Sequence, residues 1–455
     1  MTFYILHKNN NMAIVLKFGG SSQCAKGLNV MKNKICELSD KYQVFLVVSA
    51  VGKTTNNLYS ILKGEFGFYD TIYETHMNLC EELCINHRIL HKILDDLKED
   101  ILNFYSDTSI DITQQKIKII SYGEILSSTI VNEYLLKWFM PNLLVNARLL
   151  IKNKSHSSEI DDFTLNIKGE FYCDAEYAIN TIATHNIVVT QGFIASTSNN
   201  KYCILTRSGS NTTASLIASA IDAIRLEIWT DVNGVYTTDP RIVGEAKLIK
   251  SIRYEVCQEA AAMGNQLIHP FSIKPCESKN IPIYIKNTFD PESELFTIIN
   301  GHEDIVKNSV HLITYQKNVT IFKIESLDMW ETAGILFEIF TVFKNENIDI
   351  NIITTSQFSI ALTTNELSKK KIENAKTELN KKYNVKIIDE CGIVSIIADD
   401  IRNNKRLLNI HSIIHDEDEP IHIIQYGANN LTISFVINET YAKVLTKKLH
   451  VELIE

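Results

Sequence analysis

The sequence predicts an α/β protein: a mostly parallel sheet covered by helices, followed by a smaller C-terminal region built from a repeated strand–helix unit. Three observations lead to this prediction. Short β-branched runs alternate with helical stretches, polar loops follow these runs, and the order of elements changes near residue 316. Continuous apolar strands separated by helices are typical of a parallel sheet that is buried on both faces.

Five apolar runs are predicted to be strands of this sheet: residues 13–16, 44–48, 187–190, 226–229 and 281–285. Glycines or polar side chains follow the first four. In open parallel sheets, ligands bind beyond the carboxyl ends of the strands, where such loops meet. We therefore expect the functional residues at this edge of the sheet.

The C-terminal part is predicted to hold two tandem βαββαβ units. The first has strands at residues 319–323, 348–353, 358–362 and 385–388 and helices at 333–345 and 367–382. The second has strands at residues 392–398, 421–425 and 431–437 and helices at 405–414 and 439–450. The polar segment 290–308 before them is a candidate linker. Two such units form an internal repeat of the split-βαβ type.

Length and composition narrow the class of protein. A chain of 455 residues is too long for one hydrophobic core, so about two to three domains are expected. The net charge of −9 argues against a general role in binding nucleic acids or membrane surfaces, because both require a positive face. No apolar run reaches the roughly 18 residues of a spanning helix. Residues 1–11 lack the apolar core of a signal peptide.

The nine cysteines contain no CxxC pair and lie scattered along the chain. This odd number and placement predict reduced thiols and a cytoplasmic location, with each cysteine an ordinary buried side chain. Cys80 and Cys84 have helical spacing, but no set of histidines completes a metal site. No protein-bound metal is therefore expected.

Four loops at predicted strand or helix ends combine glycines with polar side chains. In the first, residues 17–22, Lys17 and two adjacent glycines can hold a phosphate through an ammonium group and backbone N–H groups, although the Walker A spacing is absent. The others are residues 49–57, 121–124 and 207–214. Each loop is also compatible with a plain turn or a capped helix.

Two of these loops are predicted to open helices. Glu124 is expected beside a helix that begins at about Ile125, where it could orient a substrate or only interact with the helix dipole. Arg207 precedes a glycine and several hydroxyl groups at the start of another helix. A fixed cation at a helix N-terminus makes an anion site that suits a substrate carboxylate.

The run from Trp229 to Arg241, WTDVNGVYTTDPR, resembles the nucleotide-binding signature of aspartate kinases in the amino-acid kinase superfamily. The four loops and the pair His269-Pro270 occur in the same order as that family's motifs. The segments 329–356 and 425–428 resemble parts of its two regulatory ACT domains. The resemblance covers nearly the whole chain after Asn11. No homoserine dehydrogenase segment follows, so the resemblance is to the monofunctional form.

This resemblance implies an amino-acid-kinase αβα sandwich at residues 12–292 and ferredoxin-like ACT domains at 316–388 and 389–455, the second completed by a strand near 308–315. It implies ATP-dependent phosphorylation of the side-chain carboxylate of L-aspartate to 4-phospho-L-aspartate, with feedback control by an amino acid. That reaction is the first step of lysine, threonine and methionine synthesis. Mg²⁺ would be held mainly by the nucleotide. A homodimer or dimer of dimers is expected, because ACT domains commonly pair edge to edge.

The resemblance also implies roles for the matching residues. Those expected in catalysis are Lys17, Gly19, Gly20 and Arg207. Those expected to bind the substrate are Ser49, Thr55, Glu124, Arg207, Ser210 and Asn211. Those expected to bind ATP are Lys17, Gly20, Ser21, Thr230, Asp231, Tyr236, Arg241 and Gln266. Those expected to bind an effector are Met329, Thr332, Gly334, Ile335, Asn351, Thr355 and Ser356. Phosphoryl transfer would then depend on positioning and charge neutralisation, because a substrate carboxylate is already ionised near pH 7.

Three segments depart from the family's pattern. The family motif L-G-R-G-G-S-D is L-T-R-S-G-S-N here, so two glycines are lost and Asn211 replaces an aspartate that pairs with the substrate's ammonium group. Gln266 replaces a lysine that faces ATP. Asn351 stands where lysine-inhibited members often have an aspartate. An amide accepts a hydrogen bond but supplies no charge.

These departures leave other functions open. The substrate could be a hydroxy acid or an N-modified aspartate, neither of which needs a carboxylate partner for an ammonium group. A protein of another class, a catalytically weak regulator that binds an amino acid, is the second alternative. Retention of Lys17, Glu124, Arg207 and Asp231 favours an active enzyme. The helix–strand pair expected to bind the effector could also be part of the core alone.

Overall fold

The computed structural model describes residues 12–106, 111–154, 170–205, 208–265, 267–301, 309–329, 333–408, 410–414 and 419–454 of the chain. Internal contacts divide the chain into two compact units. Unit 1 comprises Met1–Val235, Leu248–Tyr254 and Leu267–Glu303, and unit 2 comprises Tyr236–Lys247, Glu255–Gln266 and Asp304–Glu455. Within the described ranges, no helix has both the length and the apolar character needed to span a membrane.

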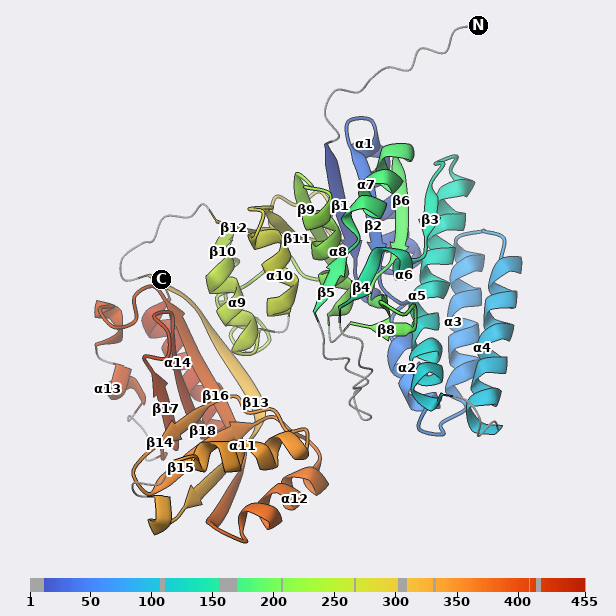
Figure 1. The fold of residues 1–455 in the computed structure, drawn as a ribbon. Helices are drawn as coiled ribbons and strands as arrows, with labels where there is room; N and C mark the ends of the chain where they lie inside the picture. Colours follow the sequence, from blue (N-terminus) through green and yellow to red (C-terminus); the bar gives the residue numbers. More distant parts are fainter. Residues whose placement is uncertain are drawn as a thin grey trace, which may run out of the picture. The chain divides into compact units, whose positions relative to one another are not determined.

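The centre of unit 1 is an eight-stranded sheet with the order β10-β12-β11-β9-β1-β2-β6-β3 (Figure 1). Its strands are β1 (Ala13–Phe18), β2 (Gln43–Val48), β3 (Leu143–Val145), β6 (Ile187–Gln191), β9 (Arg225–Thr230), β10 (Ser251–Arg253), β11 (Ile283–Asn287) and β12 (Thr297–Asn300). Every neighbouring pair is parallel except β11 with β12. The predicted mostly parallel sheet is therefore confirmed. β1 is buried along its whole length, as expected for a strand covered on both faces.

Helices and a smaller sheet surround this centre. The helices are α1 (Ala25–Ser39), α2 (Thr54–Ile61), α3 (Phe68–Glu82), α4 (Arg88–Ser106), α5 (Ile112–Lys137), α6 (Ala147–Leu150), α7 (Ala175–Thr184), α8 (Gly209–Ala220), α10 (Pro270–Glu277) and the 3₁₀ turn η1 (Gly20–Ser22). The smaller sheet has the order β5-β4-β7-β8, with β4 (Ile151–Asn153), β5 (Phe171–Cys173), β7 (Ile194–Thr197) and β8 (Tyr202–Ile204). α8 packs on β1 and β9, and α1 packs on β2. α1 buries Leu28, Met31, Ile35 and Leu38, which lie on one face at helical spacing.

Helix α5 is longer than the sequence pattern indicated. It runs for 26 residues, from Ile112 to Lys137, and the Asp111 carboxylate caps it by accepting a hydrogen bond from the Gln114 N–H at 3.1 Å. The predicted helix start near Ile125 is therefore wrong. Glu124 lies in the middle of the helix, so the interaction with a helix end that was the alternative explanation for this residue does not apply.

Contacts on two sides of α5 explain why the helix continues through this sequence. Gly123 does not end the helix. It lets α5 pack closely on the loop after β2, because a methyl group at this position would lie 3.0 Å from the Ala50 Cβ. Towards α4, the Tyr122 hydroxyl donates to the buried Asp100 carboxylate at 2.6 Å, and the Lys118 amine lies 2.8 Å from it. Burial alone would raise the pKa of Asp100, but its partners lower that pKa overall. In Figure 1, α3, α4 and α5 lie side by side as a helical layer next to β3.

Unit 2 is built on a six-stranded antiparallel sheet with the order β14-β15-β13-β16-β18-β17. Its strands are β13 (Val310–Glu325), β14 (Ile353–Thr355), β15 (Ser359–Thr364), β16 (Asn384–Ala398), β17 (Ile423–Tyr426) and β18 (Thr432–Asn438). Its helices are α11 (Ile335–Asn345), α12 (Lys369–Leu379), α13 (Ile410–Ile414), α14 (Glu439–Leu453) and the 3₁₀ turns η2 (Leu327–Met329) and η3 (Lys405–Leu407). α9 (Tyr254–Ala262) also falls almost entirely in this unit. The element order β13-α11-β14-β15-α12-β16 confirms the predicted βαββαβ arrangement.

Two long strands join the two halves of this sheet. Residues 319–325 of β13 pair with residues 384–391 of β16 in the first half. Residues 310–316 pair with residues 393–398 in the second half, and a register shift separates the two stretches. Each half has its own core: Phe322, Ile339, Phe343 and Leu379 in the first, and Ile396, Phe435, Leu445 and Leu449 in the second.

The strand predicted at 348–353 is the largest difference in this region, because regular pairing begins only at Ile353. The Thr363 hydroxyl accepts the Ile352 N–H at 3.0 Å, in place of a backbone carbonyl of the ladder. Asp349 and Asn351 also have low strand propensity. The segment therefore follows β15 irregularly before it becomes β14.

Candidate active site

Three loops meet at the carboxyl ends of β1, β2 and β9, which are neighbours in the large sheet. The Gly19 N–H donates to the Trp229 carbonyl at 3.0 Å, and the Gly52 N–H donates to the Gly20 carbonyl at 3.0 Å. The Ser49 N–H donates to the Phe18 carbonyl at 3.2 Å. The predicted phosphate loop, the loop after β2 and the start of the nucleotide-binding run thus form one framework.

Lys17 and the two glycines after it occupy the centre of this framework. The Lys17 side chain is only 8% exposed, and a methyl group at Gly19 would lie 3.4 Å from its amine, so the amine lies over the glycine turn. At Gly20 a methyl group would lie 3.0 Å from the Ala50 carbonyl and 3.2 Å from the Gly52 carbonyl. Only glycine fits such an approach without displacing backbone.

Two acids influence the pKa of Lys17. Burial lowers the pKa of the Lys17 amine to about 8, while the carboxylates of Glu124 and Asp231 act in the opposite direction. The amine is therefore a cation at neutral pH that burial leaves poorly solvated. Such a group gains free energy when a phosphate oxygen becomes its partner.

Glu124 reaches the same place from the middle of α5. It is 3% exposed, and its Oε1 accepts a hydrogen bond from the Ala50 N–H at 3.3 Å, while its Oε2 has no protein partner. Burial raises the pKa of Glu124 to about 8, and the Ala50 N–H and the Lys17 charge counteract this rise. A buried oxygen without a partner is uncommon in native proteins and suits a bound ligand that donates a hydrogen bond.

Ser49 and Thr55 lie close to Glu124, both half-buried. A methyl group at Gly123, the residue before Glu124, would lie 3.6 Å from the Thr55 hydroxyl. Ser49 directly precedes Ala50, which donates to Glu124. Three of the residues predicted to bind the substrate are thus brought together by β2, α2 and α5.

Ser210 and Asn211 form the start of α8, beside the loop after β6. A methyl group at Gly192 in that loop would lie 2.4 Å from the Ser210 Cβ, so the loop packs directly on Ser210. Asn211 is 6% exposed and its Oδ1 has no protein partner. Asn211 therefore offers a second buried acceptor, in addition to Glu124 Oε2. Arg207, the cation predicted here, lies outside the described residues.

Ser208, where the family motif has glycine, adopts a left-handed conformation with φ 59° and ψ 23°. Such a conformation costs a non-glycine residue about 1 kcal/mol or more. We expect Ser208→Gly to raise the free energy of unfolding by up to about 1 kcal/mol, less the added entropy of the unfolded chain. Urea unfolding would measure the change. Asn200→Gly is the matched control, because asparagine tolerates its φ of 56° better. A Ser208→Gly protein no more stable than the control would contradict this expectation.

The first half of the nucleotide-binding run continues β9. Thr230 is half-buried and its hydroxyl donates to the exposed Asp231 carboxylate at 3.1 Å, while Ser21 of the phosphate loop is exposed. Trp229 is buried and stacks on Phe18, with ring centroids 5.6 Å apart.

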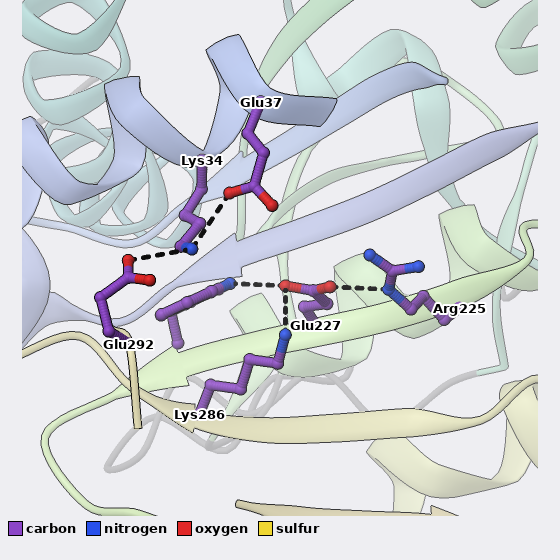
Figure 2. Close-up of polar contacts among 7 residues, drawn as sticks. Lys34, Glu37, Arg225, Glu227, Lys286 and Glu292 are labelled. Carbon is purple, nitrogen blue, oxygen red and sulfur yellow. Dashed lines mark hydrogen bonds and ion pairs between the residues drawn. The ribbon is translucent and has the colours of Figure 1, made fainter. Parts of the chain in front are cut away.

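Sequence reasoning missed a charge cluster that supports this run. Glu227 in β9 is 2% exposed and accepts from the Trp229 ring N–H at 3.1 Å. Figure 2 shows its carboxylate between the side chains of Arg225 and Lys286, at 2.6 Å and 3.3 Å. A buried carboxylate requires such partners. The three charged residues lie on the neighbouring strands β9 and β11 but are up to 61 positions apart in sequence. No short motif therefore indicates them.

The second half of the run belongs to unit 2. Tyr236 is half-buried, and the exposed Arg241 pairs with Asp239 at 2.7 Å. Thr237 is buried: its hydroxyl lies 2.9 Å from the His450 Nε2 of α14, and its carbonyl accepts the Ile313 N–H of β13 at 2.8 Å. This part of the run is thus fixed to the C-terminal helix. Gln266 lies outside the described residues.

Most described residues predicted to bind an effector line one cavity of about 280 Å³ in unit 2. Its lining is Met329, Gly334, Ile335, Leu336, Thr355, Ser356, Gln357 and Ile360, none of which carries a charge. Asn351 is not among these residues; it is exposed, and its amide donates to the Asn365 side chain. Thr332 lies outside the described residues. Leu336, Gln357 and Ile360 were not predicted.

Side chains that can ligate a metal occur in the part of the chain that the structure describes. That part contains no group of three or more histidine, cysteine or acidic side chains placed to hold a metal ion. The polar groups that converge on the sheet edge are instead an ammonium group, backbone N–H groups, hydroxyls and single carboxylates. This set suits phosphate and a small acid rather than a metal cluster.

A comparison with protein families decides the class of this site. The model of the amino acid kinase family matches residues 12–287, which include every loop at the sheet edge. This chain belongs to the amino acid kinase family. The nucleotide-binding run and the phosphate loop therefore belong to a kinase domain of that family.

Solved structures similar to this amino acid kinase family member extend over both units. Escherichia coli aspartokinase III in complex with aspartate and ADP, in the R-state, has a TM-score of 0.81 at 25% identity and covers 97% of this chain and 100% of that chain. The same enzyme in complex with lysine and aspartate, in the T-state, has a TM-score of 0.76 at 25% identity, with coverages of 98% and 100%. Aspartokinase 1, chloroplastic, of Arabidopsis thaliana is 27% identical over 97% of this chain and 80% of that relative.

Proposed function

We propose that this protein transfers the γ-phosphoryl group of ATP to the side-chain carboxylate of L-aspartate, which gives 4-phospho-L-aspartate, the first step towards lysine, threonine and methionine. The observation that carries the proposal is the buried Lys17 amine over the glycine turn, with the partnerless Glu124 Oε2 close enough to influence its charge. The aspartate and ADP bound to a similar enzyme agree with it.

Each described group then has a role in phosphoryl transfer. The Lys17 amine and the backbone N–H groups of Gly19 and Gly20 neutralise the transferring group, and Thr230 and Asp231 position the nucleotide. A substrate carboxylate oxygen attacks the γ-phosphorus, and the bond between that phosphorus and the bridging oxygen of ADP breaks. The attacking carboxylate is already ionised, so positioning and charge stabilisation supply the rate.

Substrate binding is proposed to use the buried oxygens that lack partners. Glu124 Oε2 and Asn211 Oδ1 accept from the ammonium group of aspartate, and Ser210 with Arg207 binds its α-carboxylate. The ammonium group draws Glu124 into its ionised form, because a nearby cation lowers a carboxyl pKa. Mg²⁺ is proposed to enter with the nucleotide, since the described residues provide single carboxylates rather than a metal site. Tyr236, Arg241 and Gln266 are proposed to complete the ATP site.

The experiment that tests the proposal is an ADP-release assay with Mg²⁺-ATP and L-aspartate, L-malate or N-acetyl-L-aspartate as acceptor. Turnover is expected with aspartate, with formation of an acyl phosphate that hydroxylamine traps. Turnover with only malate or only N-acetylaspartate would show that the substrate is a hydroxy acid or an N-modified acid and not aspartate. The neutral Asn211 is compatible with either. ATP binding without turnover of any acid would instead indicate a regulator.

Asn211 gives a direct test of how the substrate ammonium is held. We expect Asn211→Asp to lower the KM for aspartate about fivefold to tenfold, because a charge-assisted hydrogen bond replaces a neutral one. The KM for malate should not fall. Asn211→Leu, which has no acceptor, is the control and should raise the KM for aspartate. An unchanged or raised KM for aspartate in Asn211→Asp would place the ammonium group elsewhere.

Regulation and assembly are proposed for unit 2. The cavity beside α11 is proposed to bind an amino acid that inhibits the enzyme, as a lysine-bound relative suggests. Leu336, Phe337 and Phe340 on α11 are exposed apolar side chains, and β14 is an edge strand. We propose that this face joins a second copy in a homodimer, because exposed apolar faces and open edges are normally covered. Sedimentation of Phe337→Glu beside the unaltered chain tests it, and an unchanged mass would remove the proposal.

The domain limits and location are also proposed. Residues 12–292 are assigned to catalysis, and 316–388 and 389–455 to two ACT domains, the second completed by the start of β13. All nine cysteines are unpaired, which favours a reducing compartment such as the cytoplasm.

A further inference from the structure

The carboxyl end of β11 carries two polar residues that connect loops of the site. β11 lies beside β9, and Asn287 pairs with Thr230 in the register of the two strands. The Asn287 amide donates to the Asn233 side chain at 2.8 Å. The next residue, Thr288, is fully buried, and its N–H donates to the Thr230 carbonyl at 2.7 Å. The end of β11 is thus bonded to the nucleotide-binding run.

The Thr288 hydroxyl also reaches the phosphate loop. Its Oγ1 lies 2.7 Å from the Ser22 Oγ, which is fully buried too, and the Ser22 hydroxyl donates to the Trp229 carbonyl at 3.5 Å. Either hydroxyl can be the donor in the short bond between Ser22 and Thr288. The same Trp229 carbonyl accepts the Gly19 N–H at 3.0 Å. One hydrogen-bonded chain therefore joins β11, the phosphate loop and β9.

The segment after Thr288 is fixed to α1, the helix that follows the phosphate loop. The Lys26 amine lies 5.5 Å from the centre of the Phe289 ring. The Lys34 amine lies 3.2 Å from Glu292 and 3.1 Å from Glu37, and Figure 2 shows it between these two carboxylates. Residues that follow β11 therefore contact both Ser22 of the phosphate loop and the helix after this loop.

We propose that Thr288 is a positioning residue for phosphoryl transfer. Its hydroxyl holds the phosphate loop in register with Thr230 and Asp231, so that Lys17 and the glycine N–H groups face the phosphate that these two residues orient. The proposal rests on the proposed kinase function. Thr288 acts through Ser22 and Thr230 and contacts no substrate, because it is buried beneath both loops. A mutation away from the reacting atoms that displaces a catalytic group by about 1 Å can lower the rate about a hundredfold.

The decisive variant is Thr288→Val, which removes the hydroxyl and keeps the shape of the side chain. We expect kcat to fall about tenfold or more, while the KM for the acceptor changes little, because the acceptor-binding residues do not touch Thr288. Thr288→Ser keeps the hydroxyl and should restore most of kcat. If the role of Thr288 were purely structural, kcat of the two variants would fall in proportion to their loss of thermal stability, whether or not the hydroxyl is present.

Thr446→Val is the matched control for a lost buried hydroxyl. Thr446 in α14 is also fully buried, and its hydroxyl donates to the Ala442 carbonyl at 2.8 Å. It should lose similar stability and keep kcat. If Thr288→Val keeps the kcat of the unaltered protein, or if Thr446→Val loses as much kcat, the proposal is overturned.

A double-mutant cycle with Ser22→Ala tests the bonded chain itself. Both hydroxyls serve one link, so the double variant should have about the same kcat as the worse single variant. Independent, multiplicative effects would contradict the link. Hydrogen exchange supplies a readout that needs no turnover: Thr288→Val should speed exchange at the Gly19 and Ser22 amides, and unchanged exchange would reject the inference. An unaltered protein without kinase activity would reject the proposed function instead, and the exchange result would still decide the role of Thr288.

Discussion

Replacement of Lys17 by methionine is expected to lower kcat at least about a hundredfold, while the protein stays folded. The amine is a buried cation, and it lies over the glycine turn that we propose to receive the phosphates. Methionine fills a similar volume but cannot neutralise a transferring phosphoryl group. The KM for aspartate should change much less than kcat, because this charge matters most in the transition state.

The pH dependence of kcat/KM and the stability of the Lys17→Met protein distinguish a catalytic role of Lys17 from a structural one. Burial lowers the pKa of Lys17 to about 8, so kcat/KM of the unaltered enzyme should fall as the pH rises through about 8 and the charge is lost. A buried ammonium group also costs stability at neutral pH. The Lys17→Met protein should therefore unfold at the same temperature or higher. Urea unfolding and steady-state assays measure both.

Lys152→Met is the matched control for this variant. Lys152 is half-buried in the small sheet of unit 1, and burial lowers its pKa also, but it bonds to the Arg148 carbonyl and to Ser196. Its replacement should cost stability and leave kcat unchanged. A Lys17→Met enzyme that turns over at the normal rate would remove Lys17 from the mechanism.

The sheet edge was predictable because its signals are short. Lys17 with its glycines, and Thr230 with Asp231, each follow a β-branched run directly, and parallel strands bring their carboxyl ends to one edge. The helix around Glu124 was not predictable by the same means, because a glycine inside a helix is locally the same signal as a glycine before one. Only the packing of Gly123 on Ala50 distinguishes them.

Long-range bonds explain the other misses. Ser22 and Thr288 are 266 positions apart, and Thr237 and His450 are 213 apart, so no local pattern connects them. Asn351 was assigned to the effector site by its place in the family's pattern. In the structure its amide donates to the Asn365 side chain, and its role in binding an effector stays a prediction. Local sequence patterns therefore predicted the loops at the sheet edge and missed the distant residues that are bonded to them.

Replacement of Glu124 by glutamine is the second change with a large expected effect. We expect kcat/KM for aspartate to fall about tenfold to a hundredfold, because the substrate ammonium would lose its proposed buried, charge-assisted partner, worth about 1.5–3 kcal/mol. The Ala50 N–H can still donate to the amide oxygen, so the loop after β2 should keep its position. Steady-state kinetics with aspartate measure the loss.

The stability of the same variant relative to the unaltered protein should change with pH. The pKa of Glu124 is raised to about 8 by burial, from an ordinary value of 4.5. Between these values the folded protein binds a proton that the unfolded chain does not, so the stability from this proton is complete below about 4.5 and is lost as the pH rises through about 8. Glutamine does not titrate. Glu124→Gln should therefore gain stability relative to the unaltered protein as the pH rises from 5 to 8.5 in urea unfolding.

Glu133→Gln provides the comparison on the same helix. Glu133 is half-buried, and its carboxylate accepts from the Asn132 side chain rather than from a loop of the site. It should show neither the loss of kcat/KM nor the change with pH. A Glu124→Gln protein whose stability follows the unaltered protein at every pH would mean that Glu124 is ionised in the folded state. In that case the carboxylate would already be paired with Lys17, and the substrate ammonium would depend on Asn211.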